Sequence, residues 1–386
     1  MFKASIKSIL VLISLRLWLP CDCDIPDFEY VKPNSVDGVV DHYCAPEYNC
    51  GYDGQTLNLL CLKQRCKPTR HCGDYFKMIP LSDGERDIIT HAHNEIRHDF
   101  ILTNTDLNEL ANTTGVNITR KVESLYFYPR LEKFPGKYNE SRIKYMNEVS
   151  YDKELEFFAQ CWANYCLHDG KHANPDNCRR AFQHRDPGQT VFSYTLVTNR
   201  IQAVNFTHRK FLDRAIFAWY NEIFEYTDEM FEDVLDNYIY KEGPNTINNF
   251  IQLTYPPVNY VGCGRTQYGY GDMITLAIIC NYDKRPINNE PPYEFIDDFG
   301  ETCPGDYDHP NRTIIEERIH CTDGSGAIYY PMSFINCMYR FHAAVRRRVY
   351  EYEIYTDEST NYPGLCGRQR QLINDTWKPP FAMVTE

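Results

Sequence analysis

Two groups of residues in this chain have side chains that could do chemistry. Ser193, His208 and Asp213 supply the residue types of a hydrolase triad, but no Gly-x-Ser-x-Gly turn frames a serine. His91 and His93 could bind a metal, but they are two residues apart on a predicted helix and therefore point in different directions. No phosphate-binding glycine loop is present. Neither group alone predicts a catalytic or metal site.

The cysteines predict disulfides. The chain has 16 of them, which indicates an oxidising compartment. The intervals from Cys61 to Cys66 and from Cys161 to Cys166 each contain four residues, and no second cysteine pair at zinc-ribbon spacing lies nearby. A structural zinc site is therefore not expected.

The N-terminus and the net charge narrow the functional class. Lys3 and Lys7 precede an apolar run from Ile9 to Leu19, which is too short to span a membrane and has the length of a secretory signal core. We expect residues 1–23 to be a signal peptide, with a retained anchor as the alternative, and the mature chain to be extracellular without a membrane span. The net charge of −13 argues against a nucleic-acid partner.

Hydrophobic periodicity predicts a mixture of helices and strands. Apolar residues recur at helical spacing in Asp83 to Phe100, Tyr151 to Cys166 and Leu212 to Ile223, with Ser150 as a candidate N-cap of the second helix. Strands are predicted at 191–197, 250–254, 259–264 and 273–280. Helices around a small sheet predict an α/β fold.

Several motifs occur in a fixed order from residue 83 to residue 295. The helix motifs are His93-Asn94-Glu95-Ile96-Arg97, Trp162-Ala163 with Cys166, and Trp219-Tyr220-Asn221-Glu222; the later motifs are 249–255, Val261-Gly262-Cys263-Gly264 and Cys280-Asn281-Tyr282. Together they resemble the CAP superfamily of cysteine-rich secretory, antigen 5 and pathogenesis-related-1 proteins. The N-terminal cysteine cluster, Tyr43-Cys44 to Cys72-Gly73, is similar to that of the insect venom allergen 5 branch. The resemblance implies a disulfide-rich, three-layer α/β/α sandwich.

The resemblance also implies a cleft in which two histidines and two glutamates bind a divalent metal in many members. This chain keeps one glutamate as Glu222, but the other corresponds to Gln189 and one histidine corresponds to Asn249. The remaining histidine corresponds to His172, with His168 as the alternative. Because amides are poor zinc ligands, we expect a vestigial cleft without metal or cofactor, in which Glu222 and His172 only form hydrogen bonds.

The cysteine pairing follows from the same resemblance. Three disulfides would close the strand pair and tie the N-terminal cluster to the second helix and the loop after it: Cys263 with Cys280, Cys72 with Cys166, and Cys50 with Cys178. Cys44 would pair with Cys61 or Cys66, and Cys161 with whichever of these two remains.

Six Asn-x-Ser/Thr sequons are candidate glycosylation sites in a secreted chain. They are Asn112, Asn117, Asn139, Asn205, Asn311 and Asn374. Three of them fall within residues 102–145, which predicts an exposed insertion between the first two helices.

The C-terminal part of the chain lies beyond the resemblance. The proline- and asparagine-rich residues 286–292 predict a linker. The tail that follows carries enough cysteines for two disulfides: Cys303, Cys321, Cys337 and Cys366. The predicted division is a signal peptide at 1–23, a cysteine-rich segment at 24–82, a CAP domain at 83–294 and a C-terminal extension at 295–386.

The predicted function is that of a secreted, non-enzymatic protein. The resemblance implies binding of a small hydrophobic ligand, such as a sterol or fatty acid, or of an extracellular protein. One alternative is a metal-assisted hydrolase whose rearranged site uses Glu222 and His172. Another is a scaffold whose C-terminal tail binds a protein partner. The sequence does not identify the ligand, the partner or the oligomeric state.

Overall fold

The computed structural model describes residues 43–51, 55–62, 66–104, 131–167, 178–181, 183–197, 208–243, 245–296, 303, 354–358, 362, 365–369 and 383. The predicted signal peptide and the cysteines Cys321 and Cys337 lie outside these residues. None of the described helices has the length and apolar content needed to cross a bilayer.

The described residues form both helices and strands. The helices are α3 (Asp83–Ile101), α5 (Lys153–Asn164), α6 (His208–Asn221), α7 (Asp228–Asp236) and α8 (Asn248–Thr254), with 3-10 turns η1 (Pro46–Tyr48), η2 (Leu59–Cys61), η3 (Arg70–Cys72), η4 (Gly136–Tyr138) and η6 (Glu222–Glu225). The strands are β1 (Tyr75–Met78), β2 (Arg142–Ile143), β3 (Ser150–Tyr151), β4 (Gly188–Val197), β5 (Tyr260–Tyr270), β6 (Met273–Tyr282), β7 (Phe295–Ile296), β8 (Ile354–Glu358) and β9 (Cys366–Gln369).

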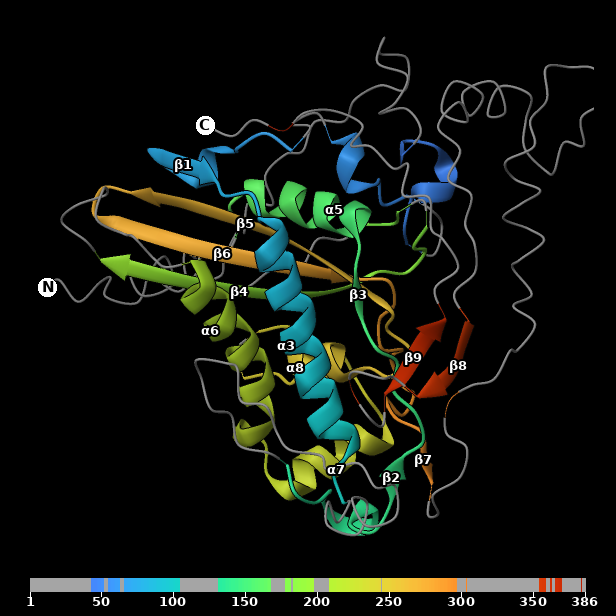
Figure 1. The fold of residues 1–386 in the computed structure, drawn as a ribbon. Helices are drawn as coiled ribbons and strands as arrows, with labels where there is room; N and C mark the ends of the chain where they lie inside the picture. Colours follow the sequence, from blue (N-terminus) through green and yellow to red (C-terminus); the bar gives the residue numbers. More distant parts are fainter. Residues whose placement is uncertain are drawn as a thin grey trace, which may run out of the picture.

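A five-stranded sheet forms the centre of the fold. Four strands follow the order β1-β5-β6-β4 with antiparallel neighbours, and β3 pairs parallel with β5. In Figure 1, α5 lies on one side of this sheet, and α3, α6 and α8 lie on the other. The architecture is therefore the three-layer α/β/α sandwich that the resemblance implies.

The helix starts follow from local capping. Ser82 and Glu85 form a capping box at the start of α3, in which each side chain accepts from the backbone N–H of the other residue. The cap of α5 is Asp152, which accepts from the Leu155 N–H at 2.8 Å. The prediction of Ser150 as this cap is wrong, because Ser150 belongs to β3 and its backbone pairs with β5.

The predicted strand at residues 250–254 is also wrong. These residues belong to α8, and all five are buried. A short helix with every side buried shows no helical period in its sequence, so a run of apolar residues is compatible with either element. The strand pair that follows is confirmed: β5 and β6 are antiparallel, Cys263 lies opposite Cys280, and Gly271 takes the positive φ of 55° in the turn.

Two glycines of β5 determine how closely α5 approaches the sheet. The ideal Cβ positions of Gly262 and Gly264 would overlap the α5 main chain. In this close contact, the Gln160 side chain pairs with the backbone of Arg265: its Oε1 accepts from the N–H at 2.9 Å, and its Nε2 donates to the carbonyl at 3.0 Å. The Val-Gly-Cys-Gly motif therefore marks the contact between helix and sheet.

Six disulfides join the described cysteines. They are Cys44–Cys61, Cys50–Cys178, Cys66–Cys161, Cys72–Cys166, Cys263–Cys280 and Cys303–Cys366. Of the two partners left open for Cys44, the structure has Cys61, and Cys66 accordingly pairs with Cys161. Three of these bonds, Cys50–Cys178, Cys66–Cys161 and Cys72–Cys166, hold the N-terminal segment against α5 and the residues that follow it.

The segment expected to be a linker lies on the surface of the domain and leads into a buried residue. Tyr293 is buried, its hydroxyl lies 2.6 Å from the Thr254 hydroxyl, and its ring contacts Phe100. Tyr238 and Glu290 form an antiparallel bridge. Residues 286–292, most of them exposed, are therefore attached to the domain through Glu290 and through the buried Tyr293 that follows them.

The expected exposed insertion at 102–145 is packed at both of its described ends. Phe134 is 2% exposed, and its ring lies against Phe100 of α3 and Phe295 of β7. The Asn104 side chain donates to the carbonyls of Tyr138 and Ser141. The prediction of exposure is therefore wrong for these ends, because aromatic residues anchor them on α3.

Part of the C-terminal extension also packs on the domain. Leu365 and Cys366 are fully buried. The Cys366 N–H donates to the Met146 carbonyl at 2.8 Å, and the Cys366 carbonyl accepts from Glu148 at 2.9 Å. The hydroxyl of Tyr362 lies 2.5 Å from His91 Nδ1 of α3. These described residues of the extension are thus part of the domain's core.

Candidate functional site

Glu222 and Asn249 meet where α6 ends and α8 begins. Glu222 opens the 3-10 turn η6 after α6, and Asn249 lies in the first turn of α8. Asn249 Nδ2 donates to Glu222 Oε1 at 2.5 Å, and the backbone N–H of Phe250 donates to Oε2 at 2.9 Å. Both carboxylate oxygens therefore accept hydrogen bonds from α8.

The Asn249 amide also connects α8 to the sheet. Its Oδ1 accepts from the backbone N–H of Val191 on β4 at 3.1 Å. The carbonyl of Val191 in turn accepts from the indole N–H of Trp219 on α6 at 3.0 Å. Asn249 thus donates through one atom and accepts through the other, which links η6, α8 and β4.

Burial controls the ionisation of Glu222. Desolvation raises the pKa of this carboxyl from its ordinary 4.5 to about 8, although the hydrogen bonds from Asn249 and Phe250 oppose the shift and Glu225 adds to it. The protonated form is therefore favoured in the folded protein at neutral pH.

We expect the free energy of unfolding of Glu222→Gln to rise relative to that of the parent as the pH rises from about 5 to about 8. The relative gain should be about 2–4 kcal/mol and should stay constant above pH 8. Below pH 4.5 the carboxyl is protonated in both the folded and unfolded states. Between 4.5 and 8 only the unfolded chain ionises, so the parent loses stability over this window. Urea unfolding across this pH range measures the effect.

Glu225→Gln on the same turn is the matched control for this series. Glu225 is exposed and contributes the smallest of the causes that act on the Glu222 pKa, so its substitution should reproduce only a small part of the pH-dependent gain. Glutamine at position 222 can accept only one of the two hydrogen bonds, which adds an offset that is independent of pH. A difference between Glu222→Gln and the parent that stays constant with pH would contradict the assigned ionisation.

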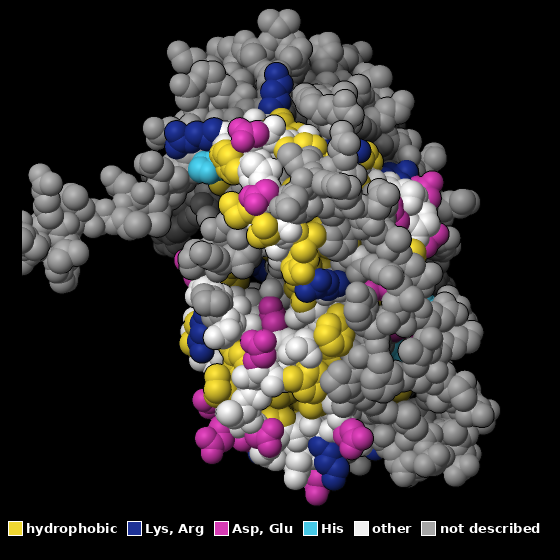
Figure 2. Space-filling view, turned by 90° about the vertical axis from the view of Figure 1, so that its left-hand side faces the viewer, with side chains coloured by type: hydrophobic (Ala, Val, Ile, Leu, Met, Phe, Trp, Pro, Cys, Tyr) yellow, Lys and Arg dark blue, Asp and Glu magenta, His cyan; other side chains and the backbone are white. Residues whose placement is uncertain are grey.

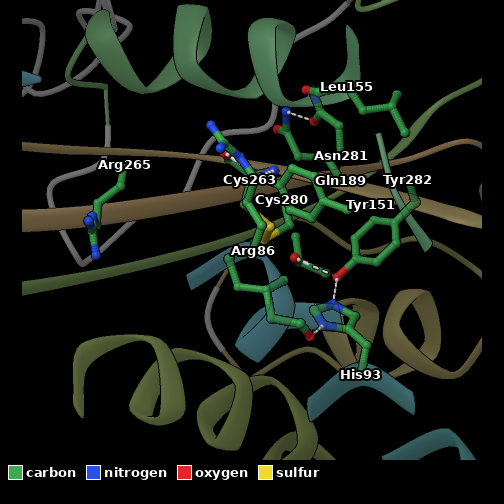
Figure 3. Close-up of a disulfide and its surroundings, with 12 residues drawn as sticks. Arg86, His93, Tyr151, Leu155, Gln189, Cys263, Arg265, Cys280, Asn281 and Tyr282 are labelled. Atoms are coloured by element: carbon green, nitrogen blue, oxygen red, sulfur yellow. Dashed lines mark hydrogen bonds between the residues drawn. A yellow bond between two sulfur atoms is a disulfide. The ribbon is translucent and has the colours of Figure 1, made fainter. Parts of the chain in front are cut away.

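Gln189 lies at the start of β4 and faces the neighbouring strand β6. Its Nε2 donates to Oδ1 of Asn281 at 2.8 Å, and Asn281 Nδ2 donates to the Leu155 carbonyl of α5 at 3.5 Å (Figure 3). The amide of Gln189 therefore takes part in a bridge from β4 through β6 to α5.

His93 joins α3 to the sheet through a buried chain of polar groups. Its Nδ1 lies 2.7 Å from the Ile89 carbonyl, which can only accept, so Nδ1 carries the proton. Its Nε2 then accepts from the Tyr282 hydroxyl at 2.9 Å, and Thr190 Oγ1 lies 3.1 Å from the same hydroxyl (Figure 3). Burial lowers the pKa of His93 to about 4, so the ring is neutral at neutral pH.

A sequence model described as "CAP: Cysteine-rich secretory protein family" matches residues 90–282, half of the chain. The chain belongs to the CAP family. Among curated CAP relatives, it is similar to a venom allergen 3 homolog from Dinoponera quadriceps, with 27% identity over 38% of this chain and 54% of that protein. A venom allergen 5 from Tityus serrulatus is 29% identical over 41% of this chain and 34% of that protein.

Solved CAP-type structures also match. One is Schistosoma mansoni venom allergen-like protein 4, with 20% identity, a TM-score of 0.33 and coverage of 55% of this chain and 96% of that one. Another is Na-ASP-1, with 16% identity, a TM-score of 0.37 and coverage of 62% and 48%. The chain spans about half the length of the first curated relative and a third of the second.

The structure brings together only some of the residues expected in the CAP cleft. Glu222 and Asn249 are in contact, and Gln189 contacts Asn281. His172 and its alternative His168 lie outside the described residues. Within the described part of the chain, no group of three His, Cys, Asp or Glu side chains could hold a metal ion.

The other candidates are the pair His91 and His93 and the group Ser193, His208 and Asp213, of which Asp213 is buried on α6. His93 is fully buried, whereas His91 is partly exposed beside Glu95 and Tyr362, so the two rings face different surroundings. Ser193 lies on β4, and the side chain of His208 is outside the described set. Asn139 is exposed, as a glycan acceptor must be, and the other five sequons lie outside the described residues.

The sequence did not anticipate the backbone contacts of Asn249. Val191 has no polar side chain, so nothing in its residue type marks it as a hydrogen-bond donor to this site. The partners of His93 were similarly missed, although His93 and Tyr282 both belong to motifs of the family. Their presence in two distant motifs was a usable signal that they meet.

Proposed function

We propose that the chain is a secreted, non-enzymatic CAP protein that binds a small hydrophobic ligand, such as a sterol or fatty acid, or an extracellular protein. The observation that carries this proposal is the closed contact between Asn249 and Glu222. The amide donates to the carboxylate and accepts from Val191, so both of its polar ends are engaged within the protein.

This arrangement does not suit zinc. Zinc sites use imidazole, thiolate and carboxylate ligands. The described cleft residues offer one carboxylate, Glu222, and the amides of Gln189 and Asn249. With burial favouring its protonated form, Glu222 is also a weak ligand near neutral pH, because a metal must displace the proton. We therefore assign the cleft a structural role.

Exposed apolar side chains support a binding role. Val197, Tyr270 and Met273 are 73%, 51% and 48% exposed, and strand register places them side by side at the tips of β4, β5 and β6. Figure 2 views the molecule from this end and shows hydrophobic side chains in several groups between charged ones. Such groups occur at ligand or protein contact sites.

The packing of the C-terminal extension limits how the scaffold alternative, in which this extension binds a protein partner, can be tested. Because Leu365 and Cys366 are buried in the domain, deleting the whole extension should destabilise the domain. It would therefore not remove a partner surface cleanly. Substitutions on exposed residues are the better test of a protein partner.

Native mass spectrometry of the secreted, deglycosylated protein tests the proposal. With a lipid extract, we expect a retained lipid adduct; with zinc, we expect no stoichiometric binding. The Asn249→His/Gln189→Glu double variant restores the family's ligand types and serves as a comparison for zinc. Stoichiometric zinc binding by the parent, with ester hydrolysis lost in Glu222→Gln, would overturn the non-enzymatic assignment.

A further inference from the structure

Three neighbouring segments concentrate positive charge on one surface. We name residues 178–187, 238–243 and 284–290 the basic surface. Its six cationic residues are Arg179, Arg180, Arg185, Lys241, Lys284 and Arg285, against three carboxylates, Asp186, Glu242 and Glu290. This excess is notable because the whole chain has a net charge of −13.

Contacts within and between the segments hold Arg180, Arg185 and Arg285 together. One oxygen of Asp186 lies 3.9 Å from Arg180 Nη2 and 3.5 Å from Arg285 Nη2, so two guanidinium groups share one carboxylate. Arg180 Nε also donates to the Arg185 carbonyl at 2.9 Å. The side chains of Arg285 and Asp186 are 60% and 63% exposed. One carboxylate cannot neutralise two arginines, so positive charge remains in excess here and is exposed to solvent at Arg285.

Exposed apolar residues lie beside this charge. Ile239, Tyr240 and Ile287 are 49%, 40% and 53% exposed. The Tyr238–Glu290 bridge sets residues 238–241 antiparallel to 287–290, and the Tyr240 N–H donates to Asn288 Oδ1 at 2.8 Å. Partial burial raises the pKa of the Tyr240 hydroxyl, and the charge of the nearby Arg179 opposes this shift. Apolar and cationic groups thus lie close together at this surface.

We propose that the basic surface docks peripherally on membranes that contain anionic phospholipids. Arginine and lysine attract phosphate and carboxylate headgroups, while exposed isoleucine and tyrosine side chains enter the interfacial region. An anionic membrane repels the negative net charge of the chain, so attraction requires that this surface faces the membrane. The exposed isoleucines favour a membrane over a sulfated polysaccharide, which offers no apolar phase.

Vesicle co-sedimentation of the full secreted chain tests this proposal. The vesicles contain phosphatidylcholine alone or phosphatidylcholine mixed with phosphatidylserine. We expect binding to the mixed vesicles that weakens at high salt. In Arg185→Gln/Lys284→Gln/Arg285→Gln, the partition coefficient should fall on the order of a hundredfold at low salt. Ile239→Ser/Ile287→Ser should also reduce binding, but with little change in its salt dependence.

The matched control removes the same charge elsewhere. Lys67→Gln/Lys77→Gln/Lys133→Gln changes three exposed lysines outside the basic surface and should retain binding. An equal loss in this control, or equal binding of the parent to both vesicle types, would overturn the proposal. So would binding of the parent to heparin but not to vesicles, which would assign the surface to a polysaccharide. A lipid adduct retained by the charge variant would show that the apolar-ligand proposal stands independently.

Discussion

Replacing Gly264 by alanine is expected to lower the free energy of unfolding by more than about 3 kcal/mol. An added Cβ would lie 2.2 Å from the backbone N of Gln160 and 2.3 Å from its Cα. These are main-chain atoms of α5, which cannot rotate out of the way as a flexible side chain can. The helix would have to move away from β5 and break the paired hydrogen bonds between Gln160 and Arg265.

Urea unfolding of the disulfide-intact protein measures this effect, and Gly84→Ala is the matched control. No atom lies within 4 Å of the Cβ that Gly84 would gain, and Gly84 is in the first turn of α3. Alanine there should therefore stabilise the protein by up to about 1 kcal/mol. Gly262→Ala should repeat the loss, because its Cβ would lie 2.2 Å from the Glu156 backbone N. A Gly264→Ala protein as stable as the parent would show that α5 is free to shift.

The long amphipathic elements could be predicted from the sequence. The stripe from Asp83 to Phe100 corresponds to α3, and the apolar run from Met273 corresponds to β6. Apolar residues recur at helical spacing along α3, and β6 is a long apolar run that starts after a glycine turn, so the local sequence indicates both elements. The short buried α8 could not be assigned this way. Its helical state depends on tertiary contacts, including the donation from Phe250 to Glu222.

The candidate site was predictable by position but not by contact. The motifs predicted that Glu222 and Asn249 lie in one cleft. In the structure, Asn249 Nδ2 lies 2.5 Å from Glu222 Oε1. The third partner is the backbone N–H of Val191. A backbone donor cannot be predicted from the type of its side chain. The burial of Leu365 in the core was likewise unpredictable, because it depends on where a distant segment returns.

Many of the motif residues that identify the family stabilise the fold. Asn94 pairs with the backbone of Val149, donating to its carbonyl at 2.9 Å and accepting from its N–H at 2.8 Å. His93 bonds to Tyr282, and the glycines of β5 admit α5. A match to these motifs therefore indicates that the chain packs in this way. It says little about catalytic or metal-binding activity, which depends on the few residues around Glu222.

Arg97→Met is expected to lower the free energy of unfolding by about 3–5 kcal/mol. Arg97 is fully buried on α3 and donates to five backbone carbonyls. The acceptors are Asn147, Leu253, Tyr255, Pro256 and Val258, at 2.9–3.4 Å. Two of them, Leu253 and Tyr255, lie at the C-terminal end of α8, where a cation also interacts favourably with the helix dipole. Methionine fills similar space but donates no hydrogen bond, so these buried carbonyls would lose a donor.

Arg97→Lys should recover only part of this loss, because an ammonium has three donors and lacks the planar fork of a guanidinium. Arg70→Met, at an exposed arginine, is the control and should change the free energy of unfolding by less than about 0.5 kcal/mol. Hydrogen exchange gives a second readout: amides of α8 should lose protection more than those of α5, since the bonds from Arg97 end at α8 and the residues that follow it. If Arg97→Met unfolds at the same urea concentration as the parent, water must reach these carbonyls, and the buried arginine does not join α3 to α8.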